Sequence, residues 1–359
     1  MAEKVLMKGN EAFAEAVIRG GCRYYFGYPI TPQSEIPEYM SRELAERGGT
    51  FLQAESELGA INMAYGCGAA GGSCFISSSS PGIALMQEGM SFLASAEVPA
   101  VLLNVSRCGP GIGGIQPGQA DYFQVTRGGG NGDYRIPVFA PSTIQEAVDI
   151  LYEAPSMADY WRNPVMILAD GIMGQMMEPV VLPEPKAPLL PGDVPKVKPW
   201  AASGSGYKEN RSVVKSLRLK PEDLEVHVEK LYEKYAQAEK ELVRYECIGL
   251  EGADIVFTAF GTMARLIHEV IELLAKEGIK AGMIRPISLW PFPYEAFDRI
   301  ESKTKVVISA ELSMGQMLQD VKMGVCGRFP VELIHRTGGI IPTSLEVAEK
   351  AKKILEGLK

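Results

Sequence analysis

The chain has 359 residues, of which 46% are hydrophobic and 22% charged, and its formal net charge is −8. Nucleic-acid binding normally relies on a basic face, so this charge argues against a nucleic-acid partner. The length exceeds the size at which one hydrophobic core usually stops growing, which predicts two domains. The first residues lack a long apolar core with a cleavage site, and no apolar run approaches about 18 residues. We therefore expect no membrane association and a cytoplasmic location.

The first half of the chain alternates helical and extended patterns, as a parallel α/β sheet does. Helical periodicity covers residues 10–19, 35–47, 57–70, 83–95 and 144–160. Extended patterns cover residues 23–27, 50–53, 73–77, 100–105, 136–139 and 165–169. This alternation predicts a first domain over residues 1–178.

A change of composition separates the two halves. Prolines crowd residues 179–199, and the run Ala201-Ala-Ser-Gly-Ser-Gly206 has linker composition. A highly charged helical pattern follows over residues 221–246. Such a helix could lie over another subunit or be a solvated surface helix. We assign residues 179–246 to a Pro-rich linker and this charged helix.

The α/β alternation restarts after the linker and predicts a second domain over residues 247–359. Extended patterns cover residues 254–259, 280–284, 305–310 and 331–335. Helical patterns cover residues 263–277, 294–300, 315–326 and 344–358.

The motifs for metals and nucleotides are weak. The six cysteines form no Cys-x-x-Cys pair and have no nearby histidine, so we expect reduced, structural thiols and no metal site on this chain. The run Gly109-Pro-Gly-Ile-Gly-Gly114 has the spacing of a dinucleotide-binding loop, but the following Gln116-Pro-Gly118 cannot open the required helix. No phosphate-binding P-loop motif is present.

Glu57 is the most informative residue. It opens the helical stretch Glu57-Leu-Gly-Ala-Ile-Asn-Met-Ala-Tyr-Gly66, in which Leu58, Ile61 and Tyr65 mark one face and small residues keep the others thin. Another backbone or a flat ligand can approach such a helix closely. A glutamate is almost never fully buried without a partner, although a carboxylate in a first helical turn is also favoured by the helix dipole alone. Both interpretations of Glu57 stay open from the residues alone.

Three segments, in order, carry a resemblance to a known family: Tyr28-Pro-Ile-Thr-Pro32, the helix opened by Glu57, and Ser77-Ser-Ser-Ser-Pro-Gly82. They resemble the pyrimidine-binding domain of thiamine-diphosphate enzymes, specifically the alpha subunit of the 2-oxoacid:ferredoxin oxidoreductases. The second half, with its Glu311-Leu-Ser-Met-Gly-Gln-Met317 run, resembles the transketolase C-terminal-type domain of the same subunits. The resemblance covers most of residues 4–355. It implies an α/β fold with a parallel sheet covered on both faces, followed by that second α/β domain.

The resemblance also implies roles for single residues. Glu57 would be the catalytic glutamate that hydrogen-bonds the aminopyrimidine ring of the cofactor. Thr31 and Arg107 would bind the substrate carboxylate, because a hydroxyl donor and a guanidinium suit that group. The resemblance places four residues of one loop beside the pyrimidine: Ser79, Ser80, Pro81 and Gly82. From the residues alone, Thr31 could be a turn residue, Arg107 a surface strand end, and the serines a turn that satisfies its own backbone.

The family binds the cofactor diphosphate through magnesium with a Gly-Asp-Gly run and a later Asn, and this chain has no such pair. The resemblance therefore implies half a cofactor site on this chain, with no metal of its own. It implies a beta subunit carrying the diphosphate and Mg²⁺, a gamma subunit, and a ferredoxin-like delta subunit with iron–sulfur clusters. Coenzyme A and an external ferredoxin would complete the reaction. We expect assembly through an apolar surface around the Glu57 helix.

The loops favour 3-methyl-2-oxobutanoate, a branched-chain substrate, over 2-oxoglutarate or pyruvate. Ser77–Gly82 and the run containing Tyr122 and Phe123 look more like the branched-chain members, and these two aromatic residues would suit an apolar tail. A 2-oxoglutarate site needs a second cation, for which three arginines are available: Arg107, Arg127 and Arg135. Two further classes stay open, namely a thiamine-dependent lyase or transferase subunit and a noncatalytic scaffold subunit.

Overall fold

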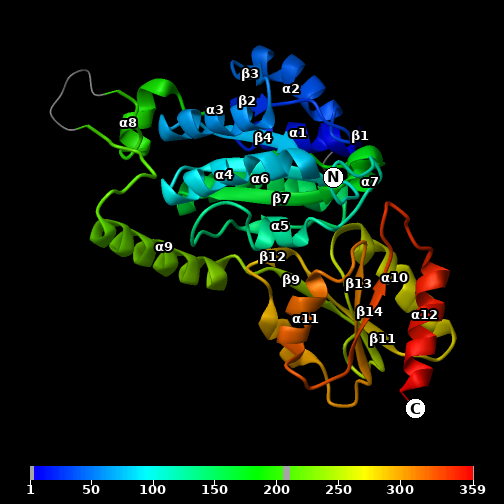
Figure 1. Cartoon of the computed structure of the whole chain (residues 1–359). Coiled ribbons are helices and arrows are strands. Elements are labelled where there is room, and N and C mark those ends of the chain that lie inside the picture. Colours follow the sequence, from blue (N-terminus) through cyan, green and yellow to red (C-terminus); the bar gives the residue numbers. More distant parts are fainter. Residues whose placement is uncertain (1–3, 205–210, 359) are drawn as a thin grey trace.

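The computed structural model describes residues 4–204 and 211–358. Its first half is built around a seven-stranded sheet (Figure 1). The strand order is β12-β6-β7-β5-β4-β2-β3. Six of these strands come from the first half of the chain and pair in parallel. They are β2 (Tyr24–Gly27), β3 (Thr50–Gln53), β4 (Cys74–Ser78), β5 (Ala100–Ser106), β6 (Val138–Phe139) and β7 (Pro164–Asp170). The central strands β4, β5 and β7 are buried along their whole length, as expected for a parallel sheet covered on both faces.

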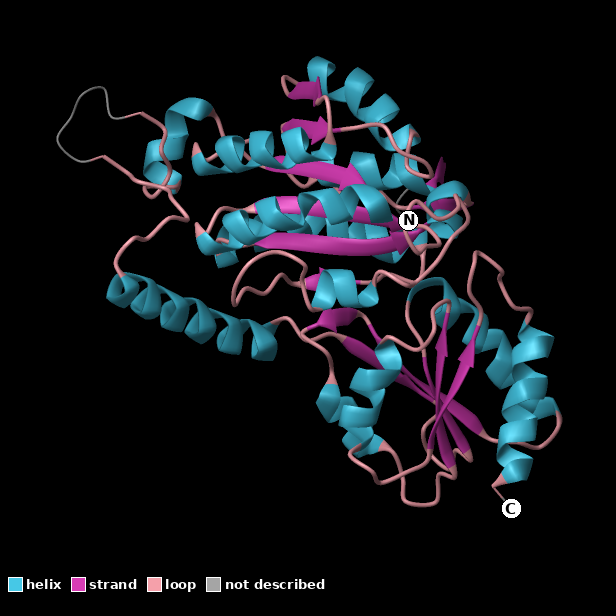
Figure 2. Cartoon of the chain, viewed as in Figure 1, coloured by secondary structure: helices cyan, strands magenta, loops and turns pink. Residues whose placement is uncertain are grey.

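Helices connect these strands and cover the sheet (Figure 2). They are α1 (Gly9–Arg19), α2 (Glu35–Glu46), α3 (Glu57–Ala69), α4 (Ser80–Ser95) and α6 (Ile144–Trp161). Helix α1 packs against α2 and α6, whereas α3 packs against α4. The prediction of a parallel sheet with helices on both faces is confirmed. None of the described helices combines the length and apolarity that a bilayer crossing requires.

Helix α3 packs mainly along a stripe of small residues. Its buried residues are Glu57, Ala60, Ile61, Ala64 and Gly68. Leu58, by contrast, is 46% exposed. The small side chains of Ala60 and Ala64 allow the helix to pack closely along this stripe, and Leu58 lies outside it.

The second sheet has five strands in the order β14-β13-β10-β11-β9. They are β9 (Tyr245–Ile248), β10 (Ile255–Thr258), β11 (Ala281–Pro286), β13 (Val306–Glu311) and β14 (Val331–His335), and β9 alone among them pairs antiparallel. Helices α10 (Gly261–Lys276) and α12 (Ser344–Gly357) pack together, and α11 (Met317–Val325) packs with the 3-10 helix η2 (Tyr294–Arg299). This second α/β unit follows the predicted order of elements, except that β9 and a short strand over residues 288–290 were not predicted.

The two halves of the chain share a sheet and a hydrophobic core. Strand β12 (Ser288–Trp290) comes from the second half but pairs antiparallel with β6 of the first sheet, and one hydrophobic core contains residues of both halves. A short antiparallel ribbon pairs β1 (Val5–Lys8) with β8 (Met177–Val180). Strands β8 and β9 span the predicted divisions at residues 178 and 246, so the division into domains stays a prediction.

The segment between the sheets carries η1 (Pro191–Asp193), α8 (Val194–Val197) and α9 (Pro221–Glu241). The predicted extension of the charged helix to residue 246 is wrong, because the chain turns after Glu241 and residue 245 begins β9. Helix α9 packs one stripe on this chain, namely His227, Leu231, Tyr235 and Ala238, with Val228 and Lys234 half-buried beside it and its other residues exposed. Ser205 and Gly206 of the predicted linker run lie outside the described residues.

Candidate active site

The predicted site residues meet at one edge of the first sheet. Strands β3, β2, β4 and β5 are neighbours and parallel, so their carboxyl ends lie side by side. Each strand is followed by part of the predicted site. Glu57 follows β3, Thr31 follows β2, Ser79–Gly82 follow β4, and Arg107 follows β5. Ligands of open α/β sheets bind beyond the carboxyl ends of the strands, so the edge is in the expected place.

Glu57 is held in the first turn of α3. The hydroxyl of Ser56 caps this helix by accepting a hydrogen bond from the Gly59 N–H at 3.1 Å. The Glu57 side chain is buried, with 6% of the residue exposed. A carboxylate in such a place calls for a polar partner.

Gly82 makes room for this carboxylate. A Cβ on residue 82 would lie 2.5 Å from Glu57 Oε1 and 2.0 Å from Ser78 Oγ. Both contacts are far below a van der Waals separation, so only glycine fits there with Glu57 in this position. The hydroxyls of Ser78 and Ser79 are buried and hydrogen-bond to no other group of the described chain. The Glu57 carboxylate and the unpaired Ser78 hydroxyl therefore meet beside Gly82.

Arg107 and Thr31 are neighbours in space although 76 positions separate them. Arg107 Nη1 donates to the Thr31 carbonyl at 2.9 Å, and Nη2 donates to the Ile112 carbonyl at 2.9 Å. The Arg107 Nε is buried and has no partner among the described residues. The Thr31 side chain is exposed. The guanidinium thus holds the Thr31 loop and keeps donor capacity for a further group.

Ser80 faces a buried acid rather than the Glu57 carboxylate. Its hydroxyl lies 2.6 Å from Asp121 Oδ2, and its backbone N–H donates to Asn104 Oδ1 at 3.1 Å. The Asn104 amide and the Ser106 hydroxyl also donate to Asp121 Oδ2, at 2.8 and 3.0 Å. Ser80 therefore fixes the start of α4 in place.

The prediction that Tyr122 lines a pocket for an apolar substrate tail is wrong. Tyr122, in the short helix α5 (Tyr122–Thr126), is fully buried and packs on Phe260 of the second half. Its hydroxyl donates to Asp320 Oδ2 at 2.7 Å. The sequence signals only an aromatic residue here, and the direction of its side chain depends on the docked second half.

Two of the three arginines considered for a second substrate carboxylate lie elsewhere. Arg127 forms an ion pair with Asp320 at 2.7 Å. Arg127 and Arg135 both line a hollow of about 480 Å³ beside Trp290 and Tyr294, and this hollow does not include Thr31 or Glu57. Arg107 is the one of the three that contacts the Thr31 loop.

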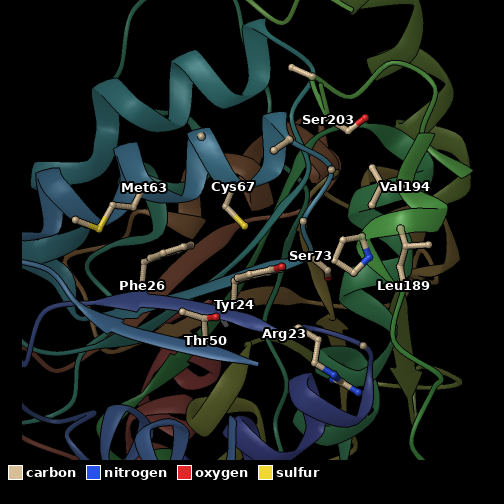
Figure 3. Close-up of a pocket in the computed structure, with 17 residues that line it drawn as sticks. Arg23, Tyr24, Phe26, Thr50, Met63, Cys67, Ser73, Leu189, Val194 and Ser203 are labelled. Carbon is tan, nitrogen blue, oxygen red and sulfur yellow. The ribbon is translucent and has the colours of Figure 1, made fainter. Parts of the chain in front are cut away.

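A separate hollow of about 700 Å³ lies at the opposite ends of the strands (Figure 3). Arg23 and Tyr24 at the start of β2 line it, with Met63 and Cys67 from the second half of α3. It contains none of the predicted site residues and is not the candidate active site.

The six cysteines are free thiols, and burial raises the pKa of Cys22 to about 12, so this thiol stays protonated.

Comparison with known proteins decides the family. The model of the pyruvate flavodoxin/ferredoxin oxidoreductase thiamine-diphosphate-binding domain matches residues 15–246, and that of the pyruvate:ferredoxin oxidoreductase core domain II matches residues 253–347. The ketoisovalerate oxidoreductase subunit VorB of Methanothermobacter marburgensis is 44% identical, over 97% of each chain. This chain belongs to the 2-oxoacid:ferredoxin oxidoreductase family.

Other members of the oxidoreductase family are also similar. The 2-oxoglutarate synthase subunit KorA of Archaeoglobus fulgidus is 36% identical over 99% of each chain. The solved 2-oxoglutarate:ferredoxin oxidoreductase of Magnetococcus marinus is 25% identical with a TM-score of 0.87, and this subunit covers 66% of that chain. A split-gene transketolase, 15% identical with a TM-score of 0.57, shares the fold. The predicted resemblance is therefore confirmed, including the thiamine-diphosphate-binding domain and the transketolase-like order of the two units. The relatives are named as subunits, and this chain is likewise an oxidoreductase subunit.

Sequence reasoning missed Asp121 and Ser78. The partners of Asp121 lie 15, 17 and 41 positions away, so no local spacing marks it. Ser78 ends β4 inside the noticed serine run, where alternation along the strand could have placed it on the opposite face from Ser77.

Proposed function

We propose that this subunit carries the cofactor-activating glutamate, Glu57, of a complex that oxidatively decarboxylates 3-methyl-2-oxobutanoate. Coenzyme A would accept the acyl group and ferredoxin the electrons, giving acyl-CoA, carbon dioxide and reduced ferredoxin. Membership of the family supports the reaction class. The name of the VorB relative, a ketoisovalerate oxidoreductase subunit, supports the branched-chain substrate.

The observation that carries the proposal is the buried carboxylate of Glu57 beside Gly82. The unpaired hydroxyl of Ser78 lies at the same place, and the neighbouring Ser79 carries a second buried, unpaired hydroxyl; both can donate or accept. An aminopyrimidine offers ring nitrogens that accept and an amino group that donates, so these residues fit that half of thiamine diphosphate. When bound, the cofactor supplies an electron sink for the loss of carbon dioxide.

The chain's own residues would then have distinct tasks. Glu57 would share a proton with a ring nitrogen of the pyrimidine, since its carboxylate is shielded from water. The Thr31 hydroxyl and the free donors of Arg107 would hold the substrate carboxylate. Pro81 and Gly82 would form the wall beside the ring, and Ser79 would offer its hydroxyl there.

Partner subunits would complete the site. The chain lacks the sequence run that binds a diphosphate with Mg²⁺, so we assign both to a beta subunit. We assign the iron–sulfur clusters to a ferredoxin-like delta subunit and propose a gamma subunit as well. The surface around α3 supports assembly there, because Leu58 and Leu85 are 46% and 56% exposed close to the candidate site.

The alternative substrate is 2-oxoglutarate, supported by the KorA relatives and the solved Magnetococcus marinus enzyme. Its second carboxylate needs a second cation. Arg127 and Arg135 lie in the other hollow, which favours a substrate with an apolar tail.

The test uses the complex purified from its natural source, with thiamine diphosphate, Mg²⁺ and coenzyme A, under anaerobic conditions. Ferredoxin reduction is compared with 3-methyl-2-oxobutanoate, 2-oxoglutarate and pyruvate. We expect the highest kcat/KM with the branched acid. A preference for another acid contradicts the substrate, and no coenzyme-A-dependent reduction with any acid favours a lyase, transferase or scaffold subunit.

The role of Glu57 is tested in the same assay with Glu57→Gln. We expect turnover to fall at least about 10²-fold with the complex intact, because proton transfer by a positioned side chain contributes about that much or more. Glu55→Gln is the matched control, since Glu55 is an exposed carboxylate two residues away. Near-normal turnover of Glu57→Gln in an intact complex contradicts a catalytic role.

A further inference from the structure

Asp121 is a buried carboxylate that the proposed chemistry does not use. It is 8% exposed, and a single oxygen, Oδ2, accepts three hydrogen bonds. The donors are the hydroxyl of Ser80 at the start of α4 and the side chains of Asn104 and Ser106, two alternate residues on one face of β5. A carboxylate that gathers donors from two elements fixes their relative position.

The element it fixes is the one beside Glu57. The Ser80 hydroxyl has one proton, and its 2.6 Å contact with the Asp121 carboxylate is shorter than the 3.2 Å contact with the Arg107 carbonyl. The proton therefore goes to Asp121, since a charged acceptor forms the stronger bond. The same hydroxyl then accepts the Arg107 N–H at 3.0 Å. Through Ser80, Asp121 holds both the α4 start that carries Gly82 and the backbone of Arg107.

The second half of the chain holds Asp121 itself. On one side, Gln119 donates its backbone N–H to the Leu312 carbonyl at 3.0 Å and accepts the Leu312 N–H at 3.0 Å. On the other side, Gln316 donates to the Ala120 carbonyl at 2.7 Å and accepts the Phe123 N–H at 2.8 Å. The residues on both sides of Asp121 are thus bound to the second half, while its side chain points to the first sheet.

The turn that carries Gln316 is itself held in place by hydrogen bonds. Gln316 lies in the turn between β13 and α11, where the buried Glu311 carboxylate accepts the N–H groups of Met317 and Leu318 at 3.0 and 2.8 Å. This carboxylate also accepts hydroxyl bonds from Ser309 and Ser313, both at 2.7 Å. A turn tied at four points presents Gln316 in one orientation.

We propose that Asp121 is a positioning residue of the cofactor site, and that the second half of the chain acts on the reaction through Gln316 and Asp121. This proposal rests on the proposed function, because it assigns Asp121 to the geometry of the Glu57 and Gly82 pair. The second half then tunes catalysis through the position of Asp121. A misplacement of about 1 Å at a reacting centre can cost about 10²-fold in rate, so this support has measurable value.

The test compares Asp121→Asn and Asp121→Ala in the assembled complex. We expect turnover to fall about 10-fold in the Asn variant, which keeps the shape but loses the charge, and further in the Ala variant. We expect the near-ultraviolet circular dichroism of the bound cofactor to weaken in the same order, while subunit composition and melting temperature of the Asn variant stay unchanged. Equal turnover and dichroism in the wild type and both variants overturn the proposal.

A double-mutant cycle tests whether the second half acts through Gln316 and then Asp121. Gln316→Ala is expected to lower turnover alone, yet to have little further effect when combined with Asp121→Ala. Arg285→Lys is the control, because Arg285 joins the two halves through Glu146 at 2.9 Å, away from Asp121. Its effect should add to that of Asp121→Ala. If the effects of Gln316→Ala and Asp121→Ala on turnover are additive, the path is overturned. If Asp121→Ala fails to assemble, the same cycle is run with Asp121→Asn.

Glu57→Gln separates the two proposals. Loss of turnover in Glu57→Gln together with full turnover in the Asp121 variants contradicts only the positioning role. Full turnover in Glu57→Gln contradicts the proposed function itself, whatever the Asp121 variants show.

Discussion

Glu57 and Gly82 are in contact across two helices: a Cβ added at residue 82 would lie 2.5 Å from the Glu57 Oε1 atom. In Gly82→Ala the added methyl group must displace both this carboxylate and the Ser78 hydroxyl. We expect turnover of the complex to fall about 10²-fold, because the proton-sharing group leaves its productive position. Steady-state ferredoxin reduction measures this effect.

The matched control is Gly66→Ala, a glycine of α3 whose added Cβ would meet no atom of this chain within 4 Å. We expect this variant to keep its turnover. Equal activity of the two alanine variants in intact complexes would contradict the close packing between Glu57 and Gly82.

Arg107→Lys tests the substrate site. A lysine keeps the charge but cannot bind the Thr31 and Ile112 carbonyls while still offering a planar pair of donors. We expect the KM for the 2-oxoacid to rise about 10-fold, consistent with the loss of one charge-assisted hydrogen bond. Arg135→Lys, in the separate hollow, is the control, and a similar rise in both variants would exclude a specific role for Arg107.

Glu311→Gln tests the turn beneath Gln316. Each oxygen of the Glu311 carboxylate accepts one backbone N–H, from Leu318 or from Met317. A glutamine amide must place an NH₂ group against one of these donors. We expect a loss of about 2 kcal/mol in the free energy of unfolding, the cost of an unsatisfied buried donor. Thermal denaturation measures it, with the exposed Glu332→Gln as control, and an unchanged melting temperature would contradict this hydrogen-bond pattern.

Lys234 gives the protein a pH-dependent stability term. Burial lowers the pKa of this amine to about 8, although the charge of Glu97 opposes the shift. Between about pH 8 and pH 10.5 the unfolded chain then binds more protons than the folded chain, so stability rises with pH. Over this pH range the free energy of unfolding of the wild type should rise by on the order of 2 kcal/mol relative to that of Lys234→Met.

Melting temperatures of wild type and Lys234→Met, measured from pH 7 to pH 10, check this expectation. Lys230→Met removes the other lysine that binds Glu97 and keeps Lys234, so the gain with pH should persist there. A constant difference between wild type and Lys234→Met at all pH values would show that the amine is not destabilised by burial.

Much of the fold was predictable because its signals are local. The buried apolar runs of β4, β5 and β7 and the periodic helices between them are readable from residue type alone. The candidate site was partly predictable for the same reason, since the ends of parallel strands meet at one edge. Glu57, Thr31 and Arg107 each follow one of these strands, and their roles stay predictions.

What could not be predicted depends on contacts between distant parts of the chain. Strand β12 has three residues, and its partner β6 lies in the other half, so no periodicity marks it. In α3 small residues occupy several faces, and local spacing could not tell that Ala60 rather than Leu58 faces inward. Asp121 is recognisable only once Ser80, Asn104 and Ser106 are seen around it.

Strand β12 has a consequence for how the chain folds. Because β12 is the edge strand of the first sheet, β6 gains its outer partner only after synthesis has passed the predicted linker and reached Trp290. A sheet edge left open in this way invites pairing with other chains. The first half is therefore expected to reach its final form late, and the two halves to melt in a single cooperative transition rather than one after the other.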